Sequence, residues 1–433
     1  MTTPVRVLAV TDSDSYVKWG AALASRMPVA WNVSLIVLAN PVLPSAVQLA
    51  AALQGSTLGH PAVIDLPALA DLVSDTQPDL VLVSVRGALV KVIVRAVLAA
   101  ATTEKRPVIV TGLPGISIPA SRLAIAHRAQ ADLFVLHSRR EVREFTALAE
   151  LMDVPQRFGL ATLPFLPRCE DAPGPGGDVI FAAQAKVPAG KDDRLALLGW
   201  LAAAAREFPE RRVIIKVRAA VGEKQTHAEK YDYAVLVGEL DPPAPANLIV
   251  AGGAMSEYLA NAAALVTVSS TAAIEAIALG VPVLAIDEFG VSAELINPVF
   301  EGSGLLGGSG DLVQGRFKRP EGVWLHDNYF HGTGGEDWIG QAEDILALRK
   351  SGDFPAKLLK QGLAGGSVRY AWDRKRALGA ADRSASGFAV LLVGTVPRLA
   401  MRTARQVRKK LRRLQPQVPL VVSRENDPGP EER

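Results

Sequence analysis

The sequence lacks the residues that several common kinds of site require. Its 433 residues include a single cysteine, Cys169. One cysteine excludes an internal disulfide and any metal site built from several thiolates, which fits a reducing compartment. No Asp-x-Asp pair follows a strand-like run in the second half of the chain, and histidines and carboxylates do not gather at metal-ligand spacing. We therefore expect no essential metal and no cofactor.

Three catalytic motifs are missing as well. Neither a Walker loop nor a Gly-x-Ser-x-Gly elbow occurs, which sets aside kinase and hydrolase functions. The first strand-like run, residues 5–10, is followed by Thr-Asp-Ser-Asp-Ser rather than by a Gly-x-Gly-x-x-Gly turn. Dinucleotide redox chemistry is therefore not expected.

Long apolar runs are absent. None approaches the ~20 residues of a membrane-spanning helix. The chain opens on a strand pattern, with no basic leader and no cleavage site. These features predict a cytoplasmic protein.

Positive charge is concentrated near the end of the chain. Residues 398–413 contain eight basic residues and no acidic one, whereas the formal net charge of the whole chain is only +3. On a helix, five apolar residues of this region would share one face: Ala400, Ala404, Val407, Leu411 and Leu414. This pattern predicts that residues 387–414 bind an anionic membrane, peripherally on the inner face of the cytoplasmic membrane. A tail that only keeps the protein in solution is the alternative, and the mildly acidic remainder argues against a nucleic-acid partner.

Two series of strand-like runs alternate with helical patterns. The first series lies at residues 5–10, 34–39, 79–85, 107–112 and 133–138, and the second at 178–184, 213–217, 234–237, 247–251, 265–270 and 282–287. Such alternation predicts two parallel sheets with helices on both faces. A stretch rich in proline and glycine, residues 161–177, separates the two series and is typical of a linker. Ligands of open parallel sheets bind beside the carboxyl ends of the strands.

The segment from residue 264 to residue 290 is the most informative. An apolar strand leads into Ser269, Ser270 and Thr271, which would open a short helix that ends at Gly280. Hydroxyls at a helix start satisfy the free amides, and these amides with the helix dipole attract phosphate. Glu275, one turn later, is placed to bond a ribose hydroxyl. The segment predicts a nucleotide-phosphate site, with a merely well-capped helix as the alternative.

This segment, with Gly-Val-Pro-Val at residues 280–283, resembles the donor-binding turn of GT-B glycosyltransferases. It is most similar to those that use cytidine-activated donors, namely bacterial polysialyltransferases, 3-deoxy-manno-octulosonate (Kdo) transferases of capsule assembly and CDP-glycerol glycerophosphotransferases. Residues 5–340 also resemble an uncharacterised family of proposed glycosyltransferases. The resemblance implies an α/β GT-B fold, with two Rossmann-like doubly wound domains facing a cleft, C-terminal helices and a basic tail, and metal-independent transfer.

On this basis the chain divides into six predicted regions. They are an acceptor domain (1–163), a linker (164–177), a nucleotide-donor domain (178–350), closing helices (351–384), a basic amphipathic membrane-associating segment (385–415) and a disordered tail (416–433). As in GT-B enzymes, some part of residues 336–380 should cross back to the first domain.

Further candidates for donor binding follow strands of the second sheet. Lys216 and Arg218 end one strand, and His227 comes later. In the cytidine-donor enzymes that the chain resembles, a Lys-x-His-Pro element binds donor phosphate at this place. Here Arg218 replaces the histidine and no proline follows, which puts a CMP-sugar in doubt, although arginine can fork two hydrogen bonds to phosphate. Gln184 and Lys186 are expected to touch the donor and His227 the leaving phosphate, with ordinary surface roles as the alternatives.

The candidates for catalysis follow strands of the first sheet. An inverting transferase needs a base within reach of the acceptor hydroxyl, and Asp14 or Asp12 fits this role. Helix capping is the alternative for both. His137, at the end of another strand, is a second candidate base. Three further residues are expected on the acceptor side of the cleft: Ser13, Gly115 and Arg128.

Together these features predict a glycosyltransferase that moves a sugar from a nucleotide-activated donor, with a cytidine type favoured, to a cell-envelope glycan or lipid-linked acceptor. Three alternatives remain open. They are a CDP-glycerol-type glycerophosphotransferase, a nucleotide-sugar epimerase of the same fold and a non-catalytic scaffold that binds a nucleotide sugar.

Overall fold

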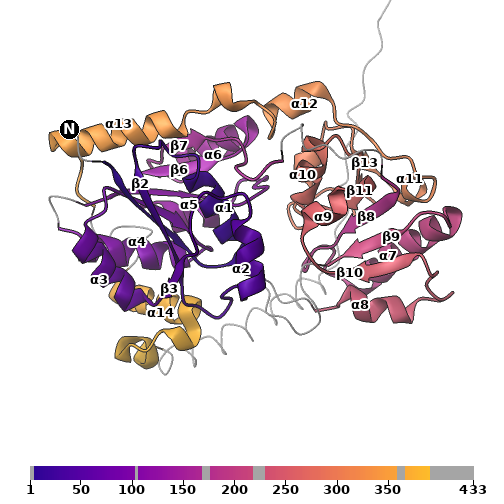
Figure 1. Cartoon of the computed structure of the whole chain (residues 1–433), viewed down its shortest axis with the longest axis horizontal. Coiled ribbons are helices and arrows are strands. Elements are labelled where there is room, and N and C mark those ends of the chain that lie inside the picture. Colours follow the sequence, from indigo (N-terminus) through magenta and orange to yellow (C-terminus); the bar gives the residue numbers. More distant parts are fainter. Residues whose placement is uncertain (1–3, 103–105, 168–175, 218–229, 358–365, 391–433) are drawn as a thin grey trace, which may run out of the picture. The chain divides into compact units, whose positions relative to one another are not determined.

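The computed structural model describes residues 4–102, 106–167, 176–217, 230–357 and 366–390 (Figure 1). The chain divides into two units, residues 1–382 and residues 383–433. The predictions for Cys169, Arg218, His227 and residues 391–433 lie outside the described residues. No described helix combines the length and the apolar character needed to cross a membrane.

The first sheet has seven strands, all paired in parallel. They are β1 (Arg6–Thr11), β2 (Asn32–Leu38), β3 (Ala62–Ile64), β4 (Leu80–Ser84), β5 (Val108–Gly112), β6 (Leu133–Leu136) and β7 (Phe158–Leu160). Their order is β3-β2-β1-β4-β5-β6-β7, so the direction of winding reverses between β1 and β4. The connecting helices are α1 (Asp14–Ala24), α2 (Ala46–Leu53), α3 (Leu66–Thr76), α4 (Leu89–Ala100), α5 (Arg122–Arg128) and α6 (Arg139–Leu151).

The second sheet has six strands and is also parallel throughout. They are β8 (Asp178–Ala182), β9 (Val213–Lys216), β10 (Leu248–Ala251), β11 (Ala262–Thr267), β12 (Val283–Ile286) and β13 (Leu306–Gly307). The order β10-β9-β8-β11-β12-β13 reverses between β8 and β11. The helices here are α7 (Lys191–Glu207), α8 (Tyr233–Leu236), α9 (Met255–Leu259), α10 (Ala272–Ala278), α11 (Ser309–Val313) and α12 (Gly322–Asp327). Two parallel doubly wound sheets of this kind form a GT-B-like fold, as predicted.

Alternate residues of each strand enter different cores because successive side chains of a strand point to opposite faces. In β1, Val7 and Ala9 pack with Trp19 of α1, whereas Leu8 and Val10 pack with α3 and α4. The same division holds in the second sheet, where α9 and α10 cover one face and α7, α8 and α11 the other. Both faces of each sheet are therefore buried, which explains the nearly continuous apolar strands.

Residues 234–237 do not form the predicted strand. They lie in α8 and a following 3₁₀ turn (Val237–Glu239). The Asp232 side chain caps α8 by accepting a hydrogen bond from Ala234 N at 2.9 Å. Tyr233 and Leu236 are buried while Val235 is 60% exposed, which is helical spacing. In the sequence, four apolar residues in a row at 234–237 do not show this helical spacing.

The chain crosses back to the first sheet, as predicted, through α13 (Trp338–Ser351). Trp338, Ala342 and Ile345 enter the core beside β1 and β5, and Figure 1 shows α13 running along β6 and β7. The predicted limit at residue 350 groups α13 with the second domain, whereas its buried face belongs to the core of the first sheet. The next helix among the described residues, α14 (Ser367–Leu378), packs against α4.

Candidate functional site

The turn formed by Ser269, Ser270 and Thr271, which we call the hydroxyl-rich turn, lies at the point where the second sheet reverses its winding. Gln184 follows β8 and Ser269 follows β11, and these two strands are neighbours. The Gln184 Oε1 atom accepts hydrogen bonds from Ser269 N and Ser269 Oγ, both at 3.0 Å. No described residue accepts a hydrogen bond from Gln184 Nε2. Gln184 and Ser269 therefore lie at the kind of reversal beside which ligands of open α/β sheets usually bind.

The three hydroxyls of the turn do not all cap α10, which corrects the expectation from sequence. Only Ser270 Oγ accepts from an amide of the helix, that of Ala272, at 3.2 Å. Ser269 is buried and bonds Gln184 instead. Thr271 occupies the N-cap position without a capping bond, and its Oγ1 accepts a bond from Ile116 N at 3.4 Å.

Loops from the carboxyl edges of both sheets meet at this turn. Gly115, in the loop after β5, lies so close to Thr271 that a Cβ on Gly115 would be 2.6 Å from Thr271 Oγ1. Glu275 of α10 forms an ion pair with Lys18 of α1, at 3.2 Å. The carboxylate that we predicted to bind ribose therefore already has a cationic neighbour from the first sheet.

A buried arginine holds the loop that carries Gln184. Arg194 of α7 is 1% exposed. Its guanidinium donates to the carbonyl oxygens of Gln184 at 2.9 Å, Ala185 at 2.8 Å and Pro188 at 2.9 Å. It also donates to Tyr231 O at 2.6 Å. Arginine has five donors in a rigid fork, so it fixes this loop more firmly than lysine would.

The other predicted donor residues have different surroundings. Lys216 is 7% exposed and its Nζ donates to Val217 O at 2.8 Å, at the end of β9. Lys186 is exposed on the loop after β8. The structure thus brings Gln184 to Ser269 and Gly115 to Thr271. It places Lys216 one strand away in β9, the neighbour of β8.

At the first sheet, Asp12 lies where the winding reverses between β1 and β4. Its carboxylate is fully buried and accepts a bond from Arg86 Nε at 2.7 Å, while Ser13 Oγ donates to it at 3.0 Å. Arg86 also reaches Asn40 Oδ1 at 3.0 Å. Burial raises the pKa of Asp12 above its usual range, although Arg86 opposes this shift. The carboxylate is committed to an internal ion pair.

His137 is a core residue. It is completely buried, its Nε2 lies 2.6 Å from the Trp19 Nε1 donor, and its Nδ1 lies 2.9 Å from Ala161 O. These distances fit a neutral ring protonated on Nδ1. Burial lowers the pKa of His137 to about 4. Gly112 makes room for the Trp19 ring, since a Cβ there would lie 2.3 Å from it.

Asp14 differs from the other two candidate bases in being only partly buried. It stands in the first turn of α1. Residues four apart share one face of a helix, so Asp14 and Lys18 lie on the same face of α1. That face is the one that reaches Glu275 of α10.

Arg128, predicted on the acceptor side, is buried at the end of α5. It donates to Gly112 O at 3.2 Å and to the Tyr16 hydroxyl at 3.3 Å. No described carboxylate forms an ion pair with it.

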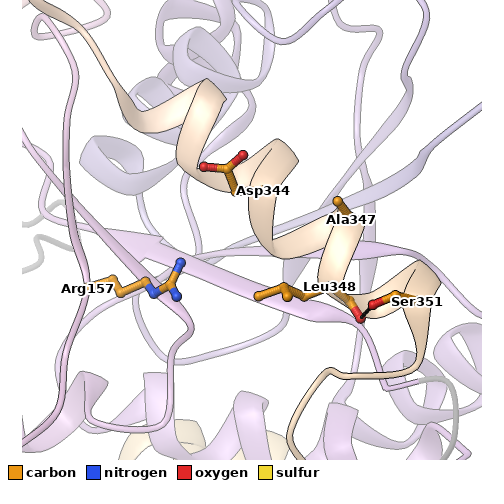
Figure 2. A pocket seen from close by; sticks show the side chains of 5 residues that line it. All are labelled: Arg157, Asp344, Ala347, Leu348 and Ser351. Carbon is orange, nitrogen blue, oxygen red and sulfur yellow. Dashed lines mark hydrogen bonds between the residues drawn. The ribbon is translucent and has the colours of Figure 1, made fainter.

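A shallow hollow of about 510 Å³ lies elsewhere, along α13. Figure 2 shows its lining residues, which are Arg157, Asp344, Ala347, Leu348 and Ser351. None of the predicted site residues lines this hollow. Within the described ranges, no group of three or more His, Cys, Asp or Glu side chains is arranged to hold a metal ion.

The family model described as "Putative glycosyltransferase (DUF6716)" matches residues 7–345. The chain belongs to this family. The match runs from β1 into α13 and includes the turn after β11. No curated protein matches the sequence.

Solved structures share the fold at low sequence identity. One is a "putative UDP-N-acetylglucosamine 2-epimerase" from Listeria monocytogenes, with 12% identity, a TM-score of 0.51 and coverage of 82% of this chain and 100% of that chain. Another is the UDP-GlcNAc 2-epimerase from Neisseria meningitidis bound to UDP-GlcNAc, with 12% identity, a TM-score of 0.50 and coverage of 79% and 98%. MnaA from S. aureus, in a co-structure with UDP, has 11% identity, a TM-score of 0.50 and coverage of 82% and 100%. These likenesses concern the fold.

Sequence reasoning missed Lys18, Arg86 and Arg194. Lys18 had a visible signal, since it lies four residues after Asp14 and so shares its helix face. Arg86 follows a predicted strand, as Asp12 does. Arg194 lies between acidic residues and apolar helix positions, and nothing in the sequence marks it as the residue that holds the Gln184 loop.

Proposed function

We propose that this family member transfers a glycosyl group from a nucleotide-activated donor, with a cytidine type favoured, to a cell-envelope glycan or lipid-linked acceptor. The observation that carries the proposal is the pairing of Gln184 with Ser269 at the reversal point of the second sheet. In this proposal residues 178–350 hold the donor and residues 1–163 the acceptor. The preference for cytidine rests on the resemblance of the turn to cytidine-donor enzymes.

The residues around the turn would bind the nucleotide. Gln184 Nε2 and the hydroxyls of Ser270 and Thr271 would donate to phosphate oxygens, while Glu275 would exchange its bond with Lys18 for one to the ribose. Donors already fixed in place stabilise the negative charge that grows on the leaving phosphate, which is the largest catalytic contribution expected here. Lys216, Lys186, Arg218 and His227 complete the proposed set of donor-binding residues.

We assign the general base to Asp14. It would take the proton of the acceptor hydroxyl while that oxygen bonds to the donor sugar carbon and the nucleotide phosphate leaves with the bonding electrons. Asp12 and His137 are less suited because both are completely buried and bonded within the first sheet. Ser13, Gly115 and Arg128 would then shape the acceptor side.

Calorimetric titration with CMP, CDP, UDP and GDP tests the donor site. The variant Gln184→Glu keeps an oxygen for Ser269 N and Oγ but replaces the amide donor by negative charge. We expect it to weaken binding of the preferred nucleotide about tenfold, because charged hydrogen bonds to phosphate contribute on this scale. Gln314→Glu, at an exposed position in the same half of the chain, is the matched control. Equal affinity in the two variants would remove Gln184 from the site.

Turnover separates transfer from epimerisation. CMP-, CDP-, UDP- and GDP-linked sugars are incubated with and without an acceptor, and the products are analysed. The proposal expects consumption of the donor only when an acceptor is present. An epimer formed without any acceptor would favour the epimerase, and tight binding without turnover would favour a scaffold.

We further propose that residues 387–414 attach the protein to an anionic membrane. Eight basic residues without an acidic one support this assignment, since each basic residue near an anionic surface contributes about 1 kcal/mol. Attachment would bring the transferase to acceptors that are linked to lipid.

A further inference from the structure

One helix on the first sheet has an exposed face without charge. Residues 27–64 contain no aspartate, glutamate, lysine or arginine, and α2 lies within this stretch. Leu49 and Ala52 of α2 pack into a small core with Val17 and Val37. The side turned away from this core consists of Ala46, Val47, Ala50 and Ala51, all exposed. A surface helix normally has charged or polar side chains on that side.

The loop before α2 extends this apolar surface. Residues 41–44 read Pro-Val-Leu-Pro, and Leu43 is 37% exposed, while Val47 is 80% exposed. A capping box fixes the start of the helix, with Gln48 N bonded to Ser45 Oγ and Ser45 N bonded to Gln48 Oε1. We call the exposed side chains of Leu43, Ala46, Val47, Ala50 and Ala51 the α2 apolar face.

The end of unit 1 lies beside this loop. Gly379, just after α14, packs so closely against Pro41 that a Cβ on it would be 2.7 Å from Pro41 Cγ. Asp382, the last residue of unit 1, is tied down because Lys375 Nζ donates to its carbonyl oxygen at 2.7 Å and Arg374 Nε to its carboxylate at 3.1 Å. The chain therefore continues into residues 383–413, which contain no acidic residue, soon after it packs against Pro41, which lies two residues before Leu43 of the α2 apolar face.

We propose that the α2 apolar face is a membrane-contact surface that enters the headgroup layer of an anionic bilayer. The basic residues at 398–413 would supply electrostatic attraction, and the α2 apolar face would supply apolar burial. Stable but reversible attachment usually needs two such contributions. A second copy of the chain fits this face less well, because eight residues span only about 12 Å and stable dimers bury about 800 Å² on each partner.

If the proposed function holds, the position of α2 lets this membrane contact serve the transfer reaction. The loop that leads into α2 leaves β2 at the carboxyl edge of the first sheet, the same edge from which Asp14 follows β1. Contact through α2 would hold that edge near the headgroups, where the reactive end of a lipid-linked acceptor lies.

Co-sedimentation of the full-length protein with vesicles tests the contact. The vesicles contain equal parts of phosphatidylcholine and phosphatidylglycerol. We expect the double variant Leu43→Asp/Val47→Asp to bind about tenfold more weakly than wild type, since it puts charge where apolar burial is needed. The control is Val235→Asp/Val323→Asp, which adds the same charge at positions 60% and 85% exposed in α8 and α12. Thermal unfolding checks that all variants are folded.

Equal vesicle binding by the two double variants would overturn the proposal. A wild-type dimer in light scattering that only Leu43→Asp/Val47→Asp dissociates, with vesicle binding unchanged, would assign the face to a second copy instead. Nucleotide affinity is measured on the same variants in solution. Failure of all nucleotides to bind would count against the proposed function and leave the vesicle result as it stands.

Discussion

At the scale of single residues, the three candidate bases that follow strands of the first sheet differ in how deeply they are buried. Asp12 and His137 are fully buried and their polar atoms are used by Arg86, Ser13 and Trp19. Asp14, two positions beyond Asp12, is partly exposed. Buried polar groups stay in a core only if they are hydrogen-bonded, so we assign Asp12 and His137 to the stability of the fold and propose the catalytic role for Asp14.

The buried His137 predicts a loss of stability in mild acid. Its pKa in the folded chain is about 4, below the ordinary value of 6.5. Between these values the unfolded chain binds a proton that the folded chain does not, so the free energy of unfolding falls as the pH drops. The expected slope is about 1.4 kcal/mol per pH unit from this one group.

Urea unfolding of wild type and His137→Gln between pH 7 and pH 4 measures this slope. Both proteins keep the buried carboxyl groups of Asp12 and Glu141. Burial raises the pKa of these groups, so they stabilise the folded chain as the pH falls, which is opposite to the effect of His137. The difference between the two curves therefore isolates His137. The stability advantage of wild type should shrink as the pH falls, and parallel curves would show that His137 does not stay neutral in the fold.

At the scale of elements, close contact between turns from the two sheets is the feature that sequence could not supply. Gly115 follows β5 and Thr271 precedes α10, so the two lie more than 150 residues apart in the sequence. Nevertheless they are so close in the fold that a Cβ on Gly115 would overlap the Thr271 side chain. The sequence marked each as a site residue for separate reasons. Their contact depends on the packing of loops from different sheets, which no local pattern encodes.

The variant Gly115→Ala tests this contact. We expect it to lower the free energy of unfolding by about 1–3 kcal/mol, because the new methyl group overlaps Thr271. In the double variant Gly115→Ala/Thr271→Ala the overlap is relieved, so a double-mutant cycle should give a coupling energy of about 0.5–3 kcal/mol. Gly177→Ala is the control, since a Cβ at Gly177 meets no atom within 4 Å. Additive effects of the two substitutions would contradict the contact.

The sequence predicted long strands better than short elements. Apart from residues 234–237, each of the predicted strand-like runs overlaps a strand of the two sheets, but β3, β7 and β13 were missed. These strands have three, three and two residues, too few for a pattern of alternation to show. The strand predicted at residues 234–237 was wrong for the same reason, because four apolar or small residues fit a strand or a helical turn equally well.

At the scale of the whole molecule, both sheets place predicted site residues where their winding reverses. Asp12 follows β1 beside β4, and Gln184 follows β8 beside Ser269 after β11. The family membership and the GT-B-like fold agree with this placement. The sequence located the ends of these strands, and the strand order, which only the structure gives, shows that they are reversal points.

Charge is distributed unevenly between the two units. Residues 398–413 contain eight basic residues, whereas residues 27–64, which include α2, contain no aspartate, glutamate, lysine or arginine. We propose one membrane-facing role for both segments, with the nucleotide site at the carboxyl edge of the second sheet. Donor binding and membrane contact would then use separate surfaces, and variants of one should leave the other unchanged.

Hydrogen–deuterium exchange with and without nucleotide tests the donor site most directly. The preferred nucleotide from the calorimetric panel is added at saturation, and exchange is followed in peptides that cover the described residues. We predict slower exchange at residues 182–186 and 267–276, with residues 62–76 as an unaffected reference. Protection confined to the first sheet, or to the hollow beside α13, would contradict the account.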